Sequence, residues 1–287
     1  MKNISTWGQS RPLALRKVRA DKFIDVQGVR TRYLEAGVEH SGVPVILVHG
    51  YNGSCDYFMP HTIPSMAVER HVVALDLPGN GLSGKLPVHS LDAYTDFLNS
   101  FIDALGFEQV DLLGHSMGGQ LAIAAVARYP RRFRKLVLVD SAGLPELVKT
   151  QWLAPIKMLT DSSLRQVRMY PTFVKIGMRA RAGREGLNII RSSSIRRELK
   201  QLNIPTLIVW GSRDRVVPLE HGAFMAKHIP GARLAIIRGA GHMPFYEKPR
   251  ECGRLILSFL RSPAEPLTED KLEFVESGSE QVAAVVE

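Results

Sequence analysis

The sequence predicts an α/β fold in which helices cover both faces of a mostly parallel sheet. Two observations support this prediction. Short apolar runs with the length of buried strands alternate with longer runs of helical spacing, an alternation that gives parallel strands joined by crossover helices. One of these runs, at 110–113, also turns through several glycines directly into an apolar helix. The eight expected strands span 23–26, 31–35, 44–49, 71–75, 110–113, 133–140, 205–210 and 234–237.

Turn and stop signals place the remaining elements. Gln27-Gly28 joins the first two strands as a hairpin. Gly106 is a helix stop, and Pro218 can begin a helix at its first position. The chain has 287 residues, which is long enough to bury a large core between these elements. The expected helices span 60–69, 91–105, the run between Ser116 and Pro130, the run after Pro218, and 250–260.

The stretch 110–127, VDLLGHSMGGQLAIAAVA, organises the rest of the chain. It holds a G-x-S-x-G motif between a strand and a helix, which is the setting of a nucleophile elbow. The sharp reversal forces Ser116 into a strained backbone conformation, and Gly114 and Gly118 lack the Cβ atoms that would collide there. The helix points its free N–H groups and its positive end at Ser116. Serine is also an ordinary helix N-cap, so the other motifs must decide between the two interpretations.

Four further loops follow expected strands, at the sheet edge where parallel sheets bind ligands. They read HGYNGS at 49–54, DLPGNGLS at 76–83, GSRDRVVP at 211–218 and GAGHMPFYEKP at 239–249. Together with the glycine turn around Ser116, these loops resemble the motifs of the α/β-hydrolase superfamily, over about residues 23 to 260. The resemblance implies the α/β-hydrolase fold, with an eight-stranded sheet and a helical cap inserted after strand six.

The same resemblance implies a catalytic triad. Ser116 would be the nucleophile, Asp214 the acid and His242 the base, in the chain order that this fold uses. The backbone N–H groups of Tyr51 and Met117 would form the oxyanion hole, which stabilises the negative charge of a tetrahedral intermediate. No metal and no organic cofactor is implied.

Three other polar residues need an interpretation. Asp140, at the end of the expected strand 133–140, rivals Asp214 because some α/β-hydrolases take their acid from this position. Asp76 precedes the nucleophile in the chain, so we interpret it as a structural turn residue. His49 lacks metal-ligand partners in the sequence, and we interpret it as a brace for its turn.

We expect a serine hydrolase that cleaves carboxylic esters, a carboxylesterase or small lipase, through an acyl-enzyme. A serine nucleophile excludes haloalkane dehalogenases and epoxide hydrolases, which carry an aspartate there. A carbon–carbon bond hydrolase of aromatic degradation stays open, although those enzymes usually have Asn and Trp where this chain has His115 and Met243. A triad-containing small-molecule receptor or signalling protein with little turnover also stays open.

The expected organisation is a core of 21–141 and 205–261, a helical cap of 142–204, a flexible basic segment 1–20 and an acidic tail 262–287. The net charge is +9, and the cap alone holds twelve basic and four acidic residues. No nucleic-acid module is evident, so this charge is interpreted as solvated surface. The basic cap, with Arg179, Arg181 and Arg184, leaves contact with an anionic membrane surface open.

Neither a membrane-spanning apolar run nor a secretory signal is evident in the sequence. The two cysteines, Cys55 and Cys252, give no disulfide framework and no metal-ligand spacing. We therefore expect a cytoplasmic protein that acts on a small-molecule ester and does not bind nucleic acid. The substrate-binding residues and the oligomeric state stay open.

Overall fold

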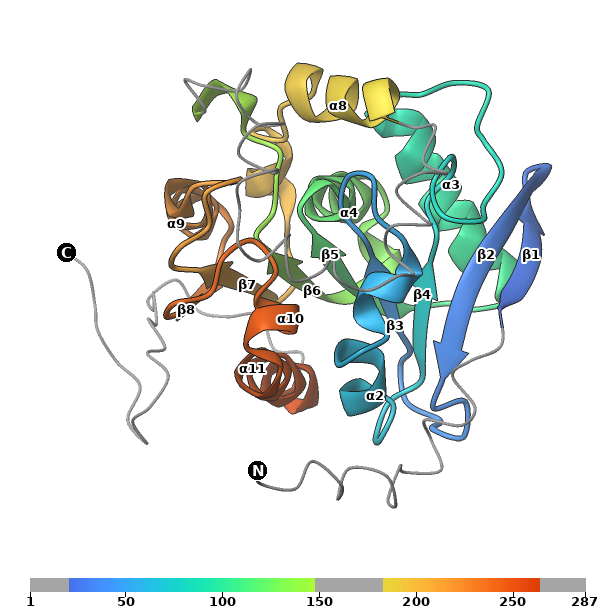
Figure 1. Ribbon diagram of the computed structural model, residues 1–287, viewed down its shortest axis with the longest axis horizontal. Coiled ribbons are helices and arrows are strands. Elements are labelled where there is room, and N and C mark those ends of the chain that lie inside the picture. The colour runs from blue at the N-terminus through green and yellow to red at the C-terminus, as the bar shows by residue number, and fades with distance from the viewer. Residues whose placement is uncertain (1–20, 148–182, 264–287) are drawn as a thin grey trace, which may run out of the picture.

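Eight strands form one sheet in the computed structural model, which describes residues 21–147 and 183–263 (Figure 1). Their order across the sheet is β1-β2-β4-β3-β5-β6-β7-β8. The β1/β2 and β2/β4 pairs are antiparallel, and every pair from β4 across to β8 is parallel. The predicted mostly parallel eight-stranded sheet is therefore confirmed. The strands are β1 (Lys22–Val26), β2 (Val29–Ala36), β3 (Val45–Val48), β4 (Val72–Leu75), β5 (Val110–His115), β6 (Phe133–Val139), β7 (Thr206–Gly211) and β8 (Arg233–Ile237).

Helices cover both faces of this sheet, again as predicted (Figure 1). One face carries α3 (Leu91–Ala104), α4 (Met117–Arg128) and α9 (Leu219–His228). The other face carries α2 (Thr62–Met66), α10 (Pro244–Glu247) and α11 (Pro249–Arg261). The helix α8 (Gly183–Ser192) packs against α4. Short 3₁₀ turns complete the description: η1 (Cys55–Phe58), η2 (Pro130–Arg132), η3 (Pro145–Leu147) and η5 (Glu198–Gln201).

The strand β3 is apolar along its whole length because it faces a helix layer on both sides. In β3, Val45 and Leu47 pack into the core beneath α2 and α11. Ile46 and Val48, which alternate with them, pack into the core beneath α3 and α4. All four side chains are fully buried. Parallel pairing with β4 and β5 on its two sides fixes the register of the strand, and so fixes where the loop after it begins.

Several expected boundaries differ from the structure, and three of them have a clear local cause. The expected helix at 60–69 is the short helix α2, preceded by the separate turn η1. Pro218 is the N-cap of α9 and not its first helical residue. The strand expected to reach Asp140 ends at Val139, since Asp140 has a φ of +43° and leaves the extended conformation. The carboxylate of Asp140 therefore does not continue the alternation of side chains along β6.

Of the expected cap, the structure describes η3, α8 and η5. The cap residues 148–182, with Arg179 and Arg181, lie outside the described residues, as do the N-terminal segment 1–20 and the tail from 264. Among the helices of the described ranges, none has the length and apolar character needed to cross a bilayer.

Candidate active site

Ser116 occupies the sharp turn between β5 and α4. Its backbone angles are φ 53° and ψ −119°, a conformation that few non-glycine residues adopt. A Cβ on Gly114 would lie 2.4 Å from the carbonyl oxygen of Gly118, and one on Gly118 would lie 2.4 Å from that of Val48. Strand and helix therefore approach each other too closely for a side chain at either glycine, as the motif predicted.

The hydroxyl of Ser116 faces a base and does not cap the helix. Ser116 holds the N-cap position of α4, but its side chain makes no capping hydrogen bond. Its Oγ lies 3.1 Å from Nε2 of His242. Only 7% of Ser116 is exposed. This geometry favours the nucleophile interpretation over the capping one.

His242 lies in the loop after β8 and connects Ser116 to a carboxylate. Its Nδ1 is 2.7 Å from Oδ2 of Asp214. A carboxylate only accepts hydrogen bonds, so Nδ1 carries the ring hydrogen and Nε2 is the acceptor for the Ser116 hydroxyl. The structure thus brings the three expected triad residues together in the order that proton transfer requires.

Asp214 is held in place by its own loop. Its Oδ1 accepts the backbone N–H groups of Val216 at 2.7 Å and Val217 at 2.9 Å. Its side chain is fully buried. The loop therefore fixes the position of the group that bonds His242.

Asp140, the rival acid, also reaches this site. It follows β6, is fully buried, and its Oδ1 accepts the N–H of Gly211 at 2.9 Å. Ligand atoms of Asp140, Asp214 and His242 all lie within 4.8 Å of one another. The hydrogen bond to the His242 ring is made by Asp214, however. The contact geometry therefore favours Asp214 over Asp140 as the acid.

Glu247 holds the loop of His242, a contact that the sequence interpretation missed. Its carboxylate accepts the N–H of Gly241 at 2.9 Å and 3.0 Å, and the N–H of Met243 at 3.1 Å. These two peptide groups flank His242. Glu247 was visible in the motif GHMPFYE, but the spacing alone gave it no role.

The turn expected to supply an oxyanion donor packs directly on the nucleophile. A Cβ on Gly50 would lie 2.9 Å from the Cβ of Ser116, so the backbone that leads into Tyr51 contacts Ser116. Met117 is the first residue of α4, and the N–H of a first helical residue has no acceptor within its helix. Both expected donor residues therefore neighbour the hydroxyl, and their role as an oxyanion hole stays a prediction.

His49 braces this turn with both ring nitrogens. Nε2 accepts the N–H of Leu77 at 3.0 Å, which leaves Nδ1 to donate to the carbonyl oxygen of Gly50 at 2.7 Å. The ring is fully buried, and burial lowers the pKa of His49. The neutral ring joins the turn at Gly50 to the loop after β4, which agrees with a structural interpretation of His49.

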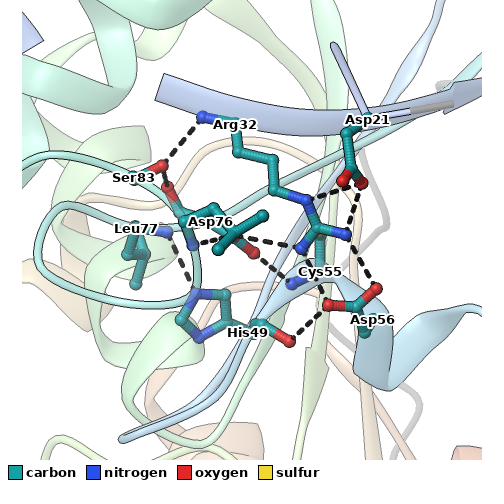
Figure 2. Close-up of polar contacts among 10 residues, drawn as sticks. Asp21, Arg32, His49, Cys55, Asp56, Asp76, Leu77 and Ser83 are labelled. Carbon is teal, nitrogen blue, oxygen red and sulfur yellow. Dashed lines mark hydrogen bonds and ion pairs between the residues drawn. The ribbon is translucent and has the colours of Figure 1, made fainter. Parts of the chain in front are cut away.

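An ion-pair network around the buried Arg32 supports the same turn from the side of β2. Arg32 lies between three carboxylates (Figure 2). Its Nη1 is 2.7 Å from Asp56 and 3.1 Å from Asp76, and its Nη2 is 2.7 Å from Asp21. Asp76 also accepts the N–H of Cys55 at 2.8 Å. Asp76 is therefore a structural turn residue, as expected, and the network ties η1 to β2 and to the loop after β4.

A small apolar cavity adjoins the site. Its volume is about 10 Å³, and it lies between α3, α4 and α8. That volume holds about one methyl group or one water molecule. The lining contains no charged side chain; it consists of Leu91, Tyr94, Met117, Leu121 and Ile189.

Comparisons with known proteins agree with this architecture. The chain is 31% identical to the dihydrolipoyllysine-residue acetyltransferase component of the acetoin cleaving system of Pseudomonas putida, over 84% of this chain and 70% of that one. It is 28% identical to Lipase 3 of a Moraxella species, over 74% of this chain and 75% of the relative. Among solved structures, a meta-cleavage product hydrolase from Pseudomonas fluorescens IP01 matches with a TM-score of 0.69 and 28% identity, over 83% of this chain and 97% of that one.

A family model described as the alpha/beta hydrolase family matches residues 45–255, which contain Ser116, Asp214 and His242. The matched range runs from β3 into α11 and so spans the parallel part of the sheet and the loops that carry the site. The chain belongs to the alpha/beta hydrolase family.

Proposed function

We propose that this chain is a serine hydrolase that cleaves carboxylic esters through an acyl-enzyme. One observation supports the proposal most directly: Ser116 Oγ lies 3.1 Å from His242 Nε2, while His242 Nδ1 lies 2.7 Å from Asp214. A serine hydroxyl is a weak nucleophile until an adjacent base removes its proton. In this proposal the strained elbow presents that hydroxyl to the substrate carbonyl.

In the first half-reaction, Ser116 Oγ bonds the ester carbonyl carbon and passes its proton to Nε2 of His242. Asp214 stabilises the resulting imidazolium. The carbonyl oxygen becomes an oxyanion and accepts the N–H groups of Tyr51 and Met117, a stabilisation worth several kcal/mol, of the order of 3 for one donor. His242 then gives its proton to the alcohol oxygen as the carbon–oxygen bond breaks.

In the second half-reaction, water attacks the acyl carbon and His242 Nε2 takes one of its protons. The bond to Ser116 Oγ then breaks, and His242 returns the proton to that oxygen. The carboxylic acid leaves and the enzyme regains its starting state. Every proton transfer uses the same ring nitrogen, which the Asp214 contact leaves free of hydrogen at the start of each half-reaction.

The cavity beside Met117 supports a short apolar acyl group. Its lining is apolar and its volume is about 10 Å³. Hydrolysis of p-nitrophenyl esters from acetate to palmitate tests both the reaction and the chain length. We expect a turnover number near or above about 1 per second on the short esters, and slower turnover of palmitate.

Variants connect that activity to the site. Ser116→Ala is expected to lose about 10⁶-fold in turnover, while Ser100→Ala, in α3, should match the unchanged protein. Full activity in Ser116→Ala would contradict the proposal. Negligible turnover of every ester, combined with thermal stabilisation by a small-molecule ligand, would instead favour a receptor or signalling protein.

A carbon–carbon bond hydrolase is the second candidate, since a meta-cleavage product hydrolase is among the similar structures. A direct comparison of kcat/KM on a meta-cleavage product and on p-nitrophenyl acetate separates the two. The ester proposal expects the acetate to be the better substrate. The reverse preference, lost in Ser116→Ala, would assign the carbon–carbon reaction to the same site.

A further inference from the structure

Asp140 is a buried carboxyl group that the proposed reaction does not use. It is fully buried at the end of β6, and its Oδ1 accepts one hydrogen bond, from the N–H of Gly211. Its Oδ2 has no hydrogen-bond partner among the described residues. Yet a ligand atom of Asp140 lies within 4.8 Å of one on Asp214 and one on His242. An ionised carboxylate oxygen without a donor is costly at such a position.

Two buried carboxyl groups this close do not both ionise at neutral pH, because like charges in a poorly solvated site repel strongly. The donors decide which group keeps the proton. Asp214 accepts three hydrogen bonds, from Val216, Val217 and the ring of His242. Among the described residues, Asp140 accepts only the one from Gly211. Asp214 therefore has the donors that a carboxylate needs, and Asp140 lacks them.

We propose that Asp140 keeps its proton on Oδ2 and donates it in a hydrogen bond to Asp214, and that it thereby acts as a positioning residue for the Asp214–His242 pair. This inference rests on the proposed function, since it takes that pair as part of the triad. The hydrogen bond gives a partner to Oδ2, the side-chain atom of Asp140 that otherwise has none among the described residues. It also adds a fourth donor to Asp214 and holds its carboxylate in line with the histidine ring.

The groups around Asp140 agree with a neutral carboxyl. Burial, followed by the charge of Asp214, raises the pKa of Asp140 well above its usual value. Glu247, on α10, raises it further. Cys252, on α11, is a fully buried thiol whose pKa burial also raises, so it stays neutral. The ring of His242 faces the pair through its Nδ1, which donates to Asp214.

The backbone at Asp140 guides the choice of variants. Its φ of +43° lies in the left-handed region, which Asp and Asn tolerate better than most residues. Asp140→Asn fits this conformation and replaces the O–H donor by an N–H donor. Asp140→Ala removes the donor altogether. Asp111→Asn is the matched control, because Asp111 is another fully buried acid, in β5, that bonds Arg134 instead of the triad.

Infrared spectroscopy tests the protonation state without any substrate. A protonated carboxyl group absorbs as a carbonyl and a carboxylate does not. At pH 7 we expect an acid carbonyl band that Asp140→Asn removes and Asp111→Asn retains. Its presence in Asp140→Asn, or its absence from the unchanged protein, would overturn the assigned proton. This outcome does not depend on ester hydrolysis, so it stays informative if the proposed function fails.

The pH dependence of Ser116 labelling by a fluorophosphonate tests the positioning role. The rate should fall at low pH as His242 takes up a proton. In Asp140→Asn the midpoint of that fall should stay within about 0.3 pH units of the unchanged protein, because neither residue carries charge. In Asp140→Ala we expect about tenfold slower labelling and a higher midpoint, because Asp214 loses a donor and attracts the proton of His242 more strongly.

Two results would overturn the positioning role. A midpoint lowered by a full pH unit in Asp140→Asn would mean that Asp140 is charged in the native protein. Unchanged labelling in a folded Asp140→Ala would mean that its hydrogen bond positions nothing. If labelling follows the expected pattern but no ester is hydrolysed, the inference stands and the ester proposal fails.

Discussion

Nε2 of His115 lies 2.8 Å from the backbone carbonyl oxygen of His242, so the residue before Ser116 is hydrogen-bonded to the residue whose ring contacts Ser116. The carbonyl accepts, which places the ring hydrogen of His115 on Nε2. The ring centroids of His115 and His242 are 4.9 Å apart, and the ring of Phe245 packs edge-on against His115 with a centroid distance of 5.0 Å. His115 is therefore part of the packing that orients His242, although it lies outside the triad.

Removing this hydrogen bond should slow the reaction. His115→Phe keeps an aromatic ring in the site but leaves the His242 carbonyl without its donor. We expect about tenfold lower kcat, the cost of one buried hydrogen bond, with KM unchanged because His115 is buried behind His242. His115→Gln retains an N–H donor and should recover most of the loss. Steady-state kinetics on p-nitrophenyl acetate checks both, and wild-type kcat in His115→Phe would contradict the role.

The same histidine should make stability depend on pH. Burial, and then the neighbouring His242, holds the pKa of His115 well below its usual value. The unfolded chain protonates this residue below about pH 6.5, while the folded protein keeps it neutral. Unfolding then takes up a proton, so the free energy of unfolding falls as pH drops below about 6.5, by at most ~1.4 kcal/mol per pH unit.

Urea unfolding at pH 7.5, 6.5 and 5.5 measures this contribution. His115→Gln removes the titrating group, so its stability should fall less on acidification than that of the unchanged protein. The difference between the two proteins isolates His115 from the other histidines. Parallel losses in both would show that His115 binds a proton in the folded state as readily as in the unfolded chain.

Gly118 should not tolerate a side chain. A Cβ there would lie 2.4 Å from the carbonyl oxygen of Val48, a backbone atom that cannot rotate away. We expect Gly118→Ala to destabilise the fold by about 2–4 kcal/mol and to displace the elbow. Gly253, in α11, has nothing closer than 3.5 Å to a Cβ, so Gly253→Ala should be neutral or stabilise the helix by up to about 1 kcal/mol. Equal unfolding midpoints for the two variants would contradict this account.

Replacing the acid should select the wrong tautomer of the base. In Asp214→Asn the amide can donate to Nδ1 of His242, which moves the ring hydrogen to Nε2, where it blocks the Ser116 proton. The expected loss in kcat is about 10⁴-fold. Asp92→Asn, an exposed acid on α3, is the control and should have no effect. If Asp140→Asn caused this loss and Asp214→Asn did not, the two acids would exchange roles.

The positions of Ser116, Asp214 and His242 could be predicted because each follows a strand in a loop with a recognisable motif. The carboxyl ends of parallel strands meet at one edge, so correct strands bring such loops together. The structural roles of Asp76 and His49 could be predicted for the same reason, since the glycines and the proline of their loops indicate tight turns.

Contacts between distant segments could not be predicted. The bond from His115 to the His242 carbonyl joins residues 127 positions apart. The approach of Asp140 to Asp214 depends on β6 and β7 being neighbours and on the positive φ at Asp140. Neither of these two contacts can be predicted from a local sequence pattern. Helix ends were misplaced where proline sits near a boundary, as at Pro218, because proline fits the N-cap and the first turn alike.

The central claim is that Ser116 is the nucleophile of an ester hydrolase, and stoichiometric labelling tests it most directly. The protein is titrated with a fluorophosphonate while p-nitrophenyl acetate hydrolysis and intact mass are followed together, and the labelled peptide is then sequenced. The account predicts one phosphonyl group per chain, on Ser116, with hydrolysis lost in proportion to labelling and no adduct in Ser116→Ala. Hydrolysis that persists in fully labelled protein, or a label on another residue that abolishes it, would contradict the account.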